Sequence, residues 1–273
     1  LNNFELGKIL IEAGAETKLK NNVRSSPLHI AASMGLKEVC ELLLEKGVKI
    51  DELNMKRKSP LHYAINHRYP DVVSLLLEKG ATTSYTDTFG NTLISLATAA
   101  KLPQIVKHLL ESTDIPVNAK GQYQATALHF AAANGCVEAA AELLKHGADP
   151  LIQDIQHRNC LFTSVSSSTN EVLELLVEHC KAKGILLLDQ ELFGTYLIHE
   201  AAVSPNAAPL IRILVEHGAN VNLQVRTELS TSFLVSLTHH CRTTKDKHHC
   251  FWLVPRTTWM PFPFYWILEL ILQ

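Results

Sequence analysis

The chain has 273 residues, of which 47% are hydrophobic and 19% are charged, and its formal net charge is −2. This length can bury a sizeable core in one or two domains, and the near-neutral charge argues against a nucleic-acid partner or an acidic membrane surface. The six cysteines are too sparse for a disulfide-stapled module, so we expect reduced thiols in a cytoplasmic protein, with the nucleus as the alternative. No signal peptide opens the sequence, and its first residue is leucine, which indicates a fragment.

The predicted elements begin with an apolar block, ELGKILIEAGAE, over Glu5–Glu16. The next stretch, SPLHIAASMG over Ser26–Gly35, starts with a serine N-cap and a proline, which together predict the start of a helix. The block VCELLLEKG, over Val39–Gly47, supplies the wide apolar stripe of a second helix, and its glycine suits a left-handed C-cap. Residues 26–47 therefore predict two short helices joined by a turn.

This pair of helices recurs along the chain. In-phase copies of the first helix begin near residues 59, 92, 126, 159 and 196, and the aligned apolar positions are 33, 33, 34, 33 and 37 residues apart: Leu28, Leu61, Ile94, Leu128, Leu161 and Ile198. The longer last step comes from four extra residues around Cys180–Gly184, which predict one more turn of the preceding helix. A fixed period near 33 predicts units that stack side by side and share one continuous core.

The period and the recurring Pro-Leu-His-x-Ala pattern resemble the ankyrin repeat. The resemblance covers about residues 1–226 and implies an all-α solenoid of stacked helix–turn–helix units with projecting hairpin fingers. Its repeats fall at about 1–23 (truncated), 24–56, 57–89, 90–123, 124–156, 157–193 and 194–226. The resemblance also implies that the histidines sharing one slot bind neighbouring backbone instead of a metal or substrate: His29, His62, His129 and His199.

No catalytic or nucleotide-binding motif occurs, so we expect a non-catalytic scaffold without a cofactor or metal. The family resemblance implies that a protein partner contacts the finger tips and the exposed positions of the first helices. Apolar residues recur at these tips, and such anchors are typical of protein interfaces. The expected contacts are Leu53, Met55, Lys56, Lys58, Asn66, His67, Thr86, Thr88, Phe89, Asn91, Gln122, Tyr123, Asn134, Gln153, Ile155, Gln156 and Arg158.

Residues 227–273 break the repeat pattern and contain all three tryptophans. The uncharged run Thr257–Leu268 is too short to span a bilayer, and the two HHC triplets that end at Cys241 and Cys250 lack the usual spacing of a zinc site. Ser236–Cys241 and Met260–Pro263 loosely resemble the elongin-binding and cullin-binding halves of a SOCS box, from which Lys245 departs. A degenerate repeat followed by a poorly ordered end is the other interpretation of this tail.

Three functions follow from these patterns. The first is a scaffold that binds a protein partner through its fingers. The second is a substrate receptor of a cullin-type ubiquitin ligase, with elongin and cullin as further partners. The third is the cytosolic ankyrin part of a larger channel or multidomain protein.

Overall fold

The computed structural model describes residues 3–113, 115–185, 188–189, 191 and 195–223. The chain forms two compact units, Leu1–Ile185 and Leu186–Gln273, and each is considered by itself. The regular elements among the described residues are thirteen α-helices and one short 3-10 helix, η1 (Gln122–Gln124). The predicted all-α fold is confirmed, whereas the exact repeat boundaries stay a prediction.

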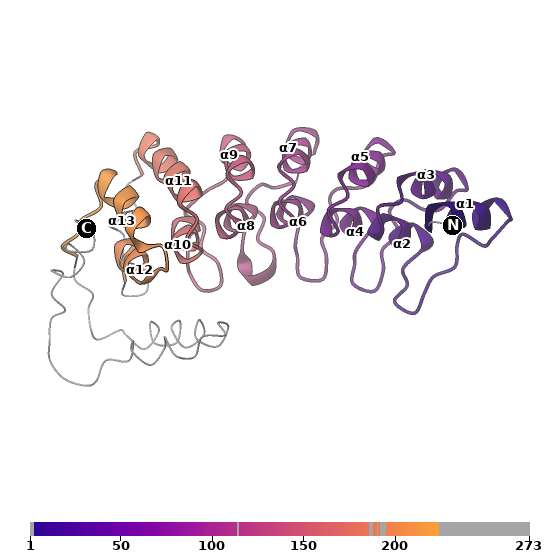
Figure 1. The fold of residues 1–273 in the computed structure, drawn as a ribbon, viewed down its shortest axis with the longest axis horizontal. Coiled ribbons are helices and arrows are strands. Elements are labelled where there is room, and N and C mark those ends of the chain that lie inside the picture. The colour runs from indigo at the N-terminus through magenta and orange to yellow at the C-terminus, as the bar shows by residue number, and fades with distance from the viewer. Residues whose placement is uncertain (1–2, 114, 186–187, 190, 192–194, 224–273) are drawn as a thin grey trace. The chain divides into compact units, whose positions relative to one another are not determined.

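The helices of the first unit form two layers (Figure 1). The first layer packs in chain order and contains α2 (Pro27–Ser33), α4 (Pro60–Asn66), α6 (Leu93–Ala99), α8 (Ala127–Asn134) and α10 (Cys160–Ser166). The second layer contains α1 (Asn3–Glu12), α3 (Lys37–Glu45), α5 (Pro70–Glu78), α7 (Pro103–Ser112), α9 (Val137–Lys145) and α11 (Asn170–Ala182). Each first-layer helix packs on the second-layer helix that follows it, and the loops between successive pairs project beyond the first layer as fingers.

The first-layer helices begin where the sequence predicts. Ser26 and Ser59 have extended backbones and are each followed by proline at the first helical position. The histidine at the third helical position folds back, and its Nδ1 accepts a hydrogen bond from the backbone N–H of the cap residue, at 3.1 Å for His29 and 3.2 Å for His62. This contact satisfies a cap N–H that would otherwise lack a partner inside the helix.

The repeated leucine slot forms the centre of the core. Leu28, Leu61, Ile94, Leu128 and Leu161 are at most 1% exposed. Facing them from the second layer are fully buried side chains such as Leu43, Leu76, Leu109, Leu143 and Leu173. Because neither helix of a pair is long enough to be stable alone, this shared apolar core holds the unit together.

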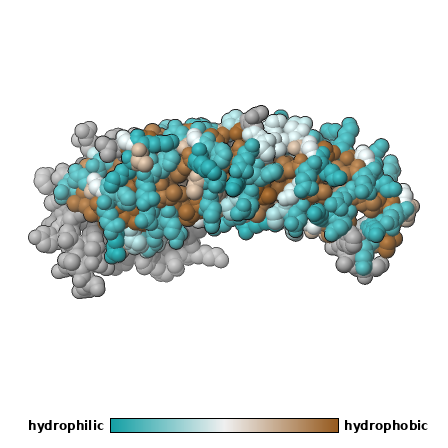
Figure 2. Space-filling view, turned by 90° about the horizontal axis from the view of Figure 1, so that it is seen from above, coloured by the Kyte–Doolittle hydropathy of each residue, from teal (hydrophilic) through white to brown (hydrophobic). Residues whose placement is uncertain are grey.

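A glycine follows each second-layer helix except α7, whose C-cap is Thr113, and the last helix of the first unit is longer than the others. Gly47 has φ +76°, the left-handed conformation that a C-cap glycine adopts. The helix α11 has 13 residues, whereas α9 has 9, which confirms the extra turn predicted from the longer repeat step. Figure 2 looks onto this layer and shows polar residues over much of it. Glu38, Lys79 and Lys107, which belong to this layer or directly follow one of its helices, are exposed.

The second unit contains α12 (Leu197–Val203) and α13 (Ala207–Glu216), which pack on each other. Ile198 occupies the leucine slot and is 5% exposed, and Leu210 and Leu214 are fully buried. The Nε2 atom of His199 lies 3.1 Å from the Leu223 carbonyl oxygen. This helix pair therefore repeats the design of the pairs in the first unit.

The tail interpretations from the sequence concern residues outside the described part of the chain. The zinc triplets, the SOCS-like motifs and the uncharged run all lie in residues 224–273. Where the structure is described, no helix has the length and apolar character needed to cross a bilayer. The described residues also contain no cluster of three or more His, Cys, Asp or Glu side chains suited to a metal ion.

Candidate protein-interaction surface on the finger tips

Five fingers of the first unit carry most of the predicted contact residues. We number them finger 1 (residues 15–26), finger 2 (48–59), finger 3 (81–92), finger 4 (115–126) and finger 5 (148–159). In finger 2 the Asn54 side chain closes the tip, because its Oδ1 accepts hydrogen bonds from the backbone N–H groups of Lys56 at 2.9 Å and Lys58 at 3.1 Å. The tip of finger 2 is thus a compact turn with a defined shape.

The same turn closes three other fingers. Asn21, Asp87 and Asp154 each accept two backbone N–H groups, two and four residues further on. This role is not among those predicted from the sequence, although Asn21, Asn54 and Asp87 follow one another at the 33-residue period. An Asn or Asp that recurs at this period, five residues before the helix N-cap, is the sequence signal that predicts the turn.

Neighbouring tips are joined by backbone hydrogen bonds. The N–H of Met55 donates to the Val23 carbonyl at 3.1 Å, which links fingers 1 and 2. The N–H of Thr88 donates to the Lys56 carbonyl at 3.3 Å, and the N–H of Ile155 donates to the Tyr123 carbonyl at 2.7 Å. Fingers 1 to 3 and fingers 4 to 5 therefore present continuous tip surfaces.

One large apolar side chain is exposed at the tip of each of fingers 2 to 5. The exposed fractions are 63% for Met55, 59% for Phe89, 66% for Tyr123 and 54% for Ile155. We call these four residues the apolar tip row. They make no contribution to the buried core, so their position at the tips is not explained by folding.

The other predicted contact residues differ in how far they reach the surface. Exposed side chains belong to Lys56, Asn66, His67, Thr88 and Gln156. Half-buried side chains belong to Leu53, Lys58, Thr86, Gln122, Asn134, Gln153 and Arg158. Arg158 is also held within its own finger, where its Nη2 lies 2.8 Å from Asp154 Oδ2.

Asn91 does not belong on the surface. It is 5% exposed, its Nδ2 donates to Asp87 Oδ2 at 3.2 Å, and its Oδ1 accepts the Gln122 N–H of the next finger at 2.9 Å. Gly121 makes room for this contact, because a Cβ there would lie 2.5 Å from Asn91 Oδ1. Asn91 joins fingers 3 and 4 from the inside, and we remove it from the proposed contact surface.

Two of the shared histidines, His29 and His129, hold adjacent units together, as the family resemblance implies. The Nδ1 of His29 accepts the Ser26 N–H, so the other nitrogen, Nε2, carries the proton and donates to the Lys58 carbonyl at 3.0 Å. His129 repeats the arrangement with the Arg158 carbonyl, also at 3.0 Å. Both imidazoles are buried, with 0% of His29 and 3% of His129 exposed. They are structural groups at the base of fingers 2 and 5.

The thiols of the first unit are buried, as predicted from their place on the helices. Cys40, Cys136, Cys160 and Cys180 are all free and buried. Burial raises the pKa of Cys40 to about 12 and that of Cys180 to about 11. These two groups stay protonated near neutral pH and are poor nucleophiles.

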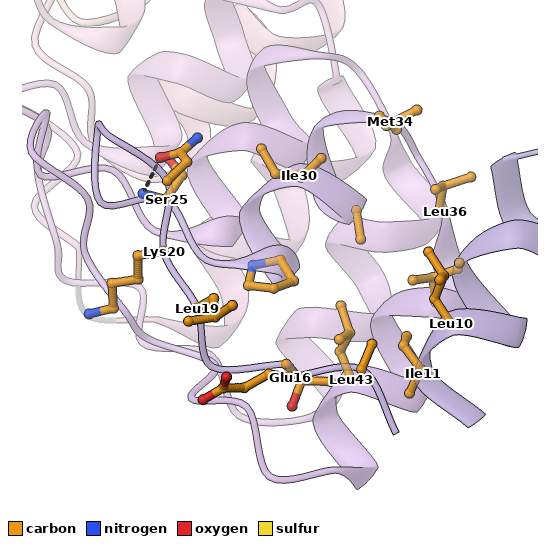
Figure 3. Close-up of a pocket in the computed structure, with 17 residues that line it drawn as sticks. Leu10, Ile11, Glu16, Leu19, Lys20, Ser25, Ile30, Met34, Leu36 and Leu43 are labelled. Atoms are coloured by element: carbon orange, nitrogen blue, oxygen red, sulfur yellow. Dashed lines mark hydrogen bonds between the residues drawn. The ribbon is translucent and has the colours of Figure 1, made fainter. Parts of the chain in front are cut away.

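An apolar groove of about 530 Å³ opens at the α1 end of the first unit (Figure 3). It is lined by Leu10 and Ile11 of α1 and by Ile30 and Met34 of α2. In the next repeat the Ile30 slot holds Tyr63, whose ring meets the His29 ring edge-on at 5.6 Å. Ile30 has no such first-layer neighbour among the described residues and is 44% exposed. The groove thus occupies the place that a first-layer helix takes elsewhere in the stack.

A family model described as ankyrin repeats (3 copies) matches residues 1–87 and 82–154, more than half of the chain. The chain belongs to the ankyrin-repeat family. The crystal structure of the ankyrin repeat domain of Bcl-3, described as a unique member of the IkappaB protein family, is similar to it. The TM-score is 0.61 with 31% sequence identity, and the match covers 74% of this chain and 90% of that domain.

Three curated relatives match smaller parts of the chain. The B-cell lymphoma 3 protein homolog of Mus musculus is 32% identical over 139 residues, which is 50% of this chain and 30% of the relative. The nuclear factor NF-kappa-B p105 subunit of Gallus gallus is 26% identical over 50% of this chain and 14% of that protein. The palmitoyltransferase AKR1 of Lachancea kluyveri is 45% identical over 23% of this chain and 9% of that enzyme. The chain therefore spans less than a third of each of these relatives.

One property of the finger tips can be tested without knowing a partner. Arg57 has φ +54° at the turn position where finger 3 has Gly90 with φ +78°. A left-handed backbone costs a residue with a Cβ about 1–2 kcal/mol. We expect Arg57→Gly to raise the free energy of unfolding by about 1 kcal/mol, since glycine gives back part of this gain through its freedom in the unfolded chain.

Urea unfolding followed by circular dichroism measures this change. Gly90→Ala is the reciprocal control and should lower stability by a similar amount. A destabilised Arg57→Gly variant would contradict the strain assigned to the tip of finger 2.

Proposed function

We propose that this ankyrin-repeat chain is a non-catalytic scaffold that binds a protein partner through the finger tips and the exposed ends of the first-layer helices. The observation that carries the proposal is the apolar tip row, with four large side chains more than half exposed on successive fingers. Anchors of this kind, surrounded by polar residues such as Thr88 and Gln156, are what protein interfaces use. The cytoplasm or the nucleus suits the buried, reduced thiols.

The first experiment places a photo-crosslinking amino acid at Tyr123 in the full chain and identifies the proteins that crosslink in cell extract. We expect discrete protein partners at Tyr123 and none at Lys107, an exposed position of the second layer. The partners should be lost when Met55, Phe89 and Ile155 are changed to serine in the same chain.

A control variant has the same number of apolar-to-serine changes as the tip variant, at positions outside the fingers. Val203, Val215 and Val221 are exposed apolar residues of the second unit and belong to none of fingers 1 to 5. Changing them to serine should leave the crosslinked partners unchanged. If the tip variant and the control variant crosslink equally, the tip row is not the partner surface.

A regulator of the IkappaB type is the second candidate function. It is favoured by the similarity to the Bcl-3 ankyrin domain, which extends over 90% of that domain. If the function is shared, an excess of purified Bcl-3 ankyrin domain should compete for the proteins that crosslink at Tyr123. Unchanged crosslinking would show that this chain binds proteins that the Bcl-3 ankyrin domain does not bind, which would contradict the IkappaB-type function.

The ligase-receptor alternative depends on Ser236–Cys241 and Met260–Pro263, which lie outside the described residues. Co-purification of elongins with the full chain tests it. Loss of elongins on changing Leu237 and Cys241 to serine would support it, and absence of elongins would dismiss it.

A further inference from the structure

Charge is distributed unevenly over the five fingers. The chain as a whole has a net charge of −2, yet fingers 1 and 2 are both basic. Finger 3 contains one charged residue, the buried Asp87, and finger 5 has two acidic residues against one arginine. The basic residues of fingers 1 and 2 are Lys18, Lys20, Arg24, Lys49, Lys56, Arg57 and Lys58.

Two of the three acidic residues in these fingers are already engaged. Asp51 accepts hydrogen bonds from the backbone N–H of Thr82 at 2.8 Å and from its hydroxyl at 2.6 Å. Glu52 forms an ion pair with Lys20. Arg24, Lys56 and Arg57, in contrast, are exposed and form no ion pair with any described residue. The tips of fingers 1 and 2 therefore present uncompensated positive charge.

The arginines occupy these tips at a cost in backbone energy. Arg24 has φ +59° and Arg57 has φ +54°. Their N–H groups close the turn on Asn21 and Asn54, at 2.8 and 3.0 Å, as the N–H of Gly90 closes the turn on Asp87 at 3.0 Å in finger 3. Glycine fits this turn without strain, so the fold does not require arginine there. Strain held at an exposed site is grounds to look for a role of the side chain in binding.

The basic tips adjoin the apolar tip row. Met55 directly precedes the basic run, and the hydrogen bond from Thr88 to the Lys56 carbonyl places the tip of finger 3, with Phe89, against the tip of finger 2. Figure 1 shows the fingers succeeding one another along one edge of the first unit. A ligand that follows this edge meets the positive charge of fingers 1 and 2, beside exposed Leu19 and Met55, and then the apolar side chains of fingers 3 to 5.

We propose that the partner presents an extended acidic segment followed by apolar residues, with the acidic part on fingers 1 and 2 and the apolar part on the tip row. This inference rests on the proposed scaffold function and specifies the chemistry of the partner. Neighbouring helices pack about 8–10 Å apart, so five fingers extend over roughly 40 Å, which about 12 extended residues cover. A nucleic acid suits the edge less well, because its phosphates continue past finger 2, whereas fingers 3 to 5 together contain only two basic residues, Lys120 and Arg158.

The test uses the full chain and a phage-displayed library of random peptides of about 16 residues. We expect enrichment of peptides with Asp and Glu at one end and Leu, Phe or Trp at the other. Enriched peptides, measured by fluorescence anisotropy, should bind at least tenfold more weakly to an Arg24→Gly, Lys56→Gln, Arg57→Gly variant. Affinity for the unmodified chain should fall steeply as NaCl is raised.

The control variant removes the same charge from the second layer through Lys37→Gln, Lys79→Gln and Lys107→Gln, and should bind like the unmodified chain. The two glycine changes are expected to relieve strain, and urea unfolding of the tip variant checks that a loss of binding does not result from unfolding. Selected peptides without acidic bias, or no selected peptides, would overturn the proposed chemistry. Equal binding of a single-stranded DNA oligonucleotide, lost in the same variant, would also overturn it.

The two proposals can fail separately. If changing the apolar tip row removes the crosslinked partners while the charge variant keeps them, the scaffold function holds and the acidic partner segment is wrong. If neither variant changes crosslinking, the finger tips are not the interface.

Discussion

Leu61→Ala is expected to lower the free energy of unfolding of the first unit by about 3 kcal/mol, within the 2–5 kcal/mol range typical of buried leucines. Leu61 is 1% exposed and lies on α4, which packs between α2 and α6 in the first layer. Truncation leaves a cavity between three helices whose positions are fixed by their own neighbours. Each repeat is stabilised by contacts with the next. We therefore also expect the repeats before and after α4 to unfold at different urea concentrations once the contacts of Leu61 are lost.

Urea unfolding followed by circular dichroism, together with hydrogen exchange, measures both effects. Ile155→Ala is the matched control, since Ile155 is 54% exposed, and it should change stability by less than about 0.5 kcal/mol. A loss below about 1 kcal/mol for Leu61→Ala would contradict the packing of α4.

The stacked pairs of helices can be predicted from patterns that are visible in this single sequence. The leucine slot recurs at a period near 33, and its members are all buried because every pair of helices meets its neighbours in the same way. Serine followed by proline starts α2 and α4 where predicted. Four additional residues lengthen α11 by about one turn, because an α-helix has about 3.6 residues per turn.

The finger tips are less predictable because small backbone choices decide which way a side chain points. Asn91 lies in phase with the half-buried Lys58 and Arg158, yet it turns inward because Gly121 of the next finger leaves space for its amide. The only sequence signal for the left-handed backbone at Arg57 is Gly90 at the same position of the next finger, since arginine itself rarely adopts this conformation. The apolar tips were found from the sequence because no burial pattern of the repeat accounts for them.

The groove at the α1 end was also missed, for a different reason. Ile30 and Met34 look like ordinary core residues in the sequence, and their exposure depends on whether a helix lies beside them. A repeat pattern predicts which face of a helix is apolar but leaves open what covers that face at the end of a stack.

Acid should destabilise the first unit through its buried histidines. Burial is the main cause that lowers the pKa of His62, to about 4, with Lys58 and His29 acting in the same direction and Asp87 opposing them. Burial also lowers the pKa of His29 and of His129. Protonation would in addition place a second N–H against the N–H of the helix cap, where Nδ1 now accepts a hydrogen bond.

Each of these imidazoles binds its proton less tightly in the fold than in the unfolded chain, where the pKa is about 6.5. Between pH 6.5 and 4 the unfolded chain therefore holds more protons, and the free energy of unfolding falls as the pH is lowered. For His62 alone the expected loss between pH 7 and 4.5 is about 2 kcal/mol. Carboxylates also titrate near the lower end of this range, so the effect has to be measured as a difference between variants.

His62→Gln should reduce the loss of stability between pH 7 and 4.5 by about 2 kcal/mol relative to the unmodified chain. It should also lower stability at pH 7, because the ring no longer fills its buried site. His108→Gln, at an exposed position of α7, is the control and should keep the pH dependence of the unmodified chain. If both variants lose stability with pH in parallel with the unmodified chain, His62 is not held neutral by the fold, and the uptake of protons on acid unfolding has another origin.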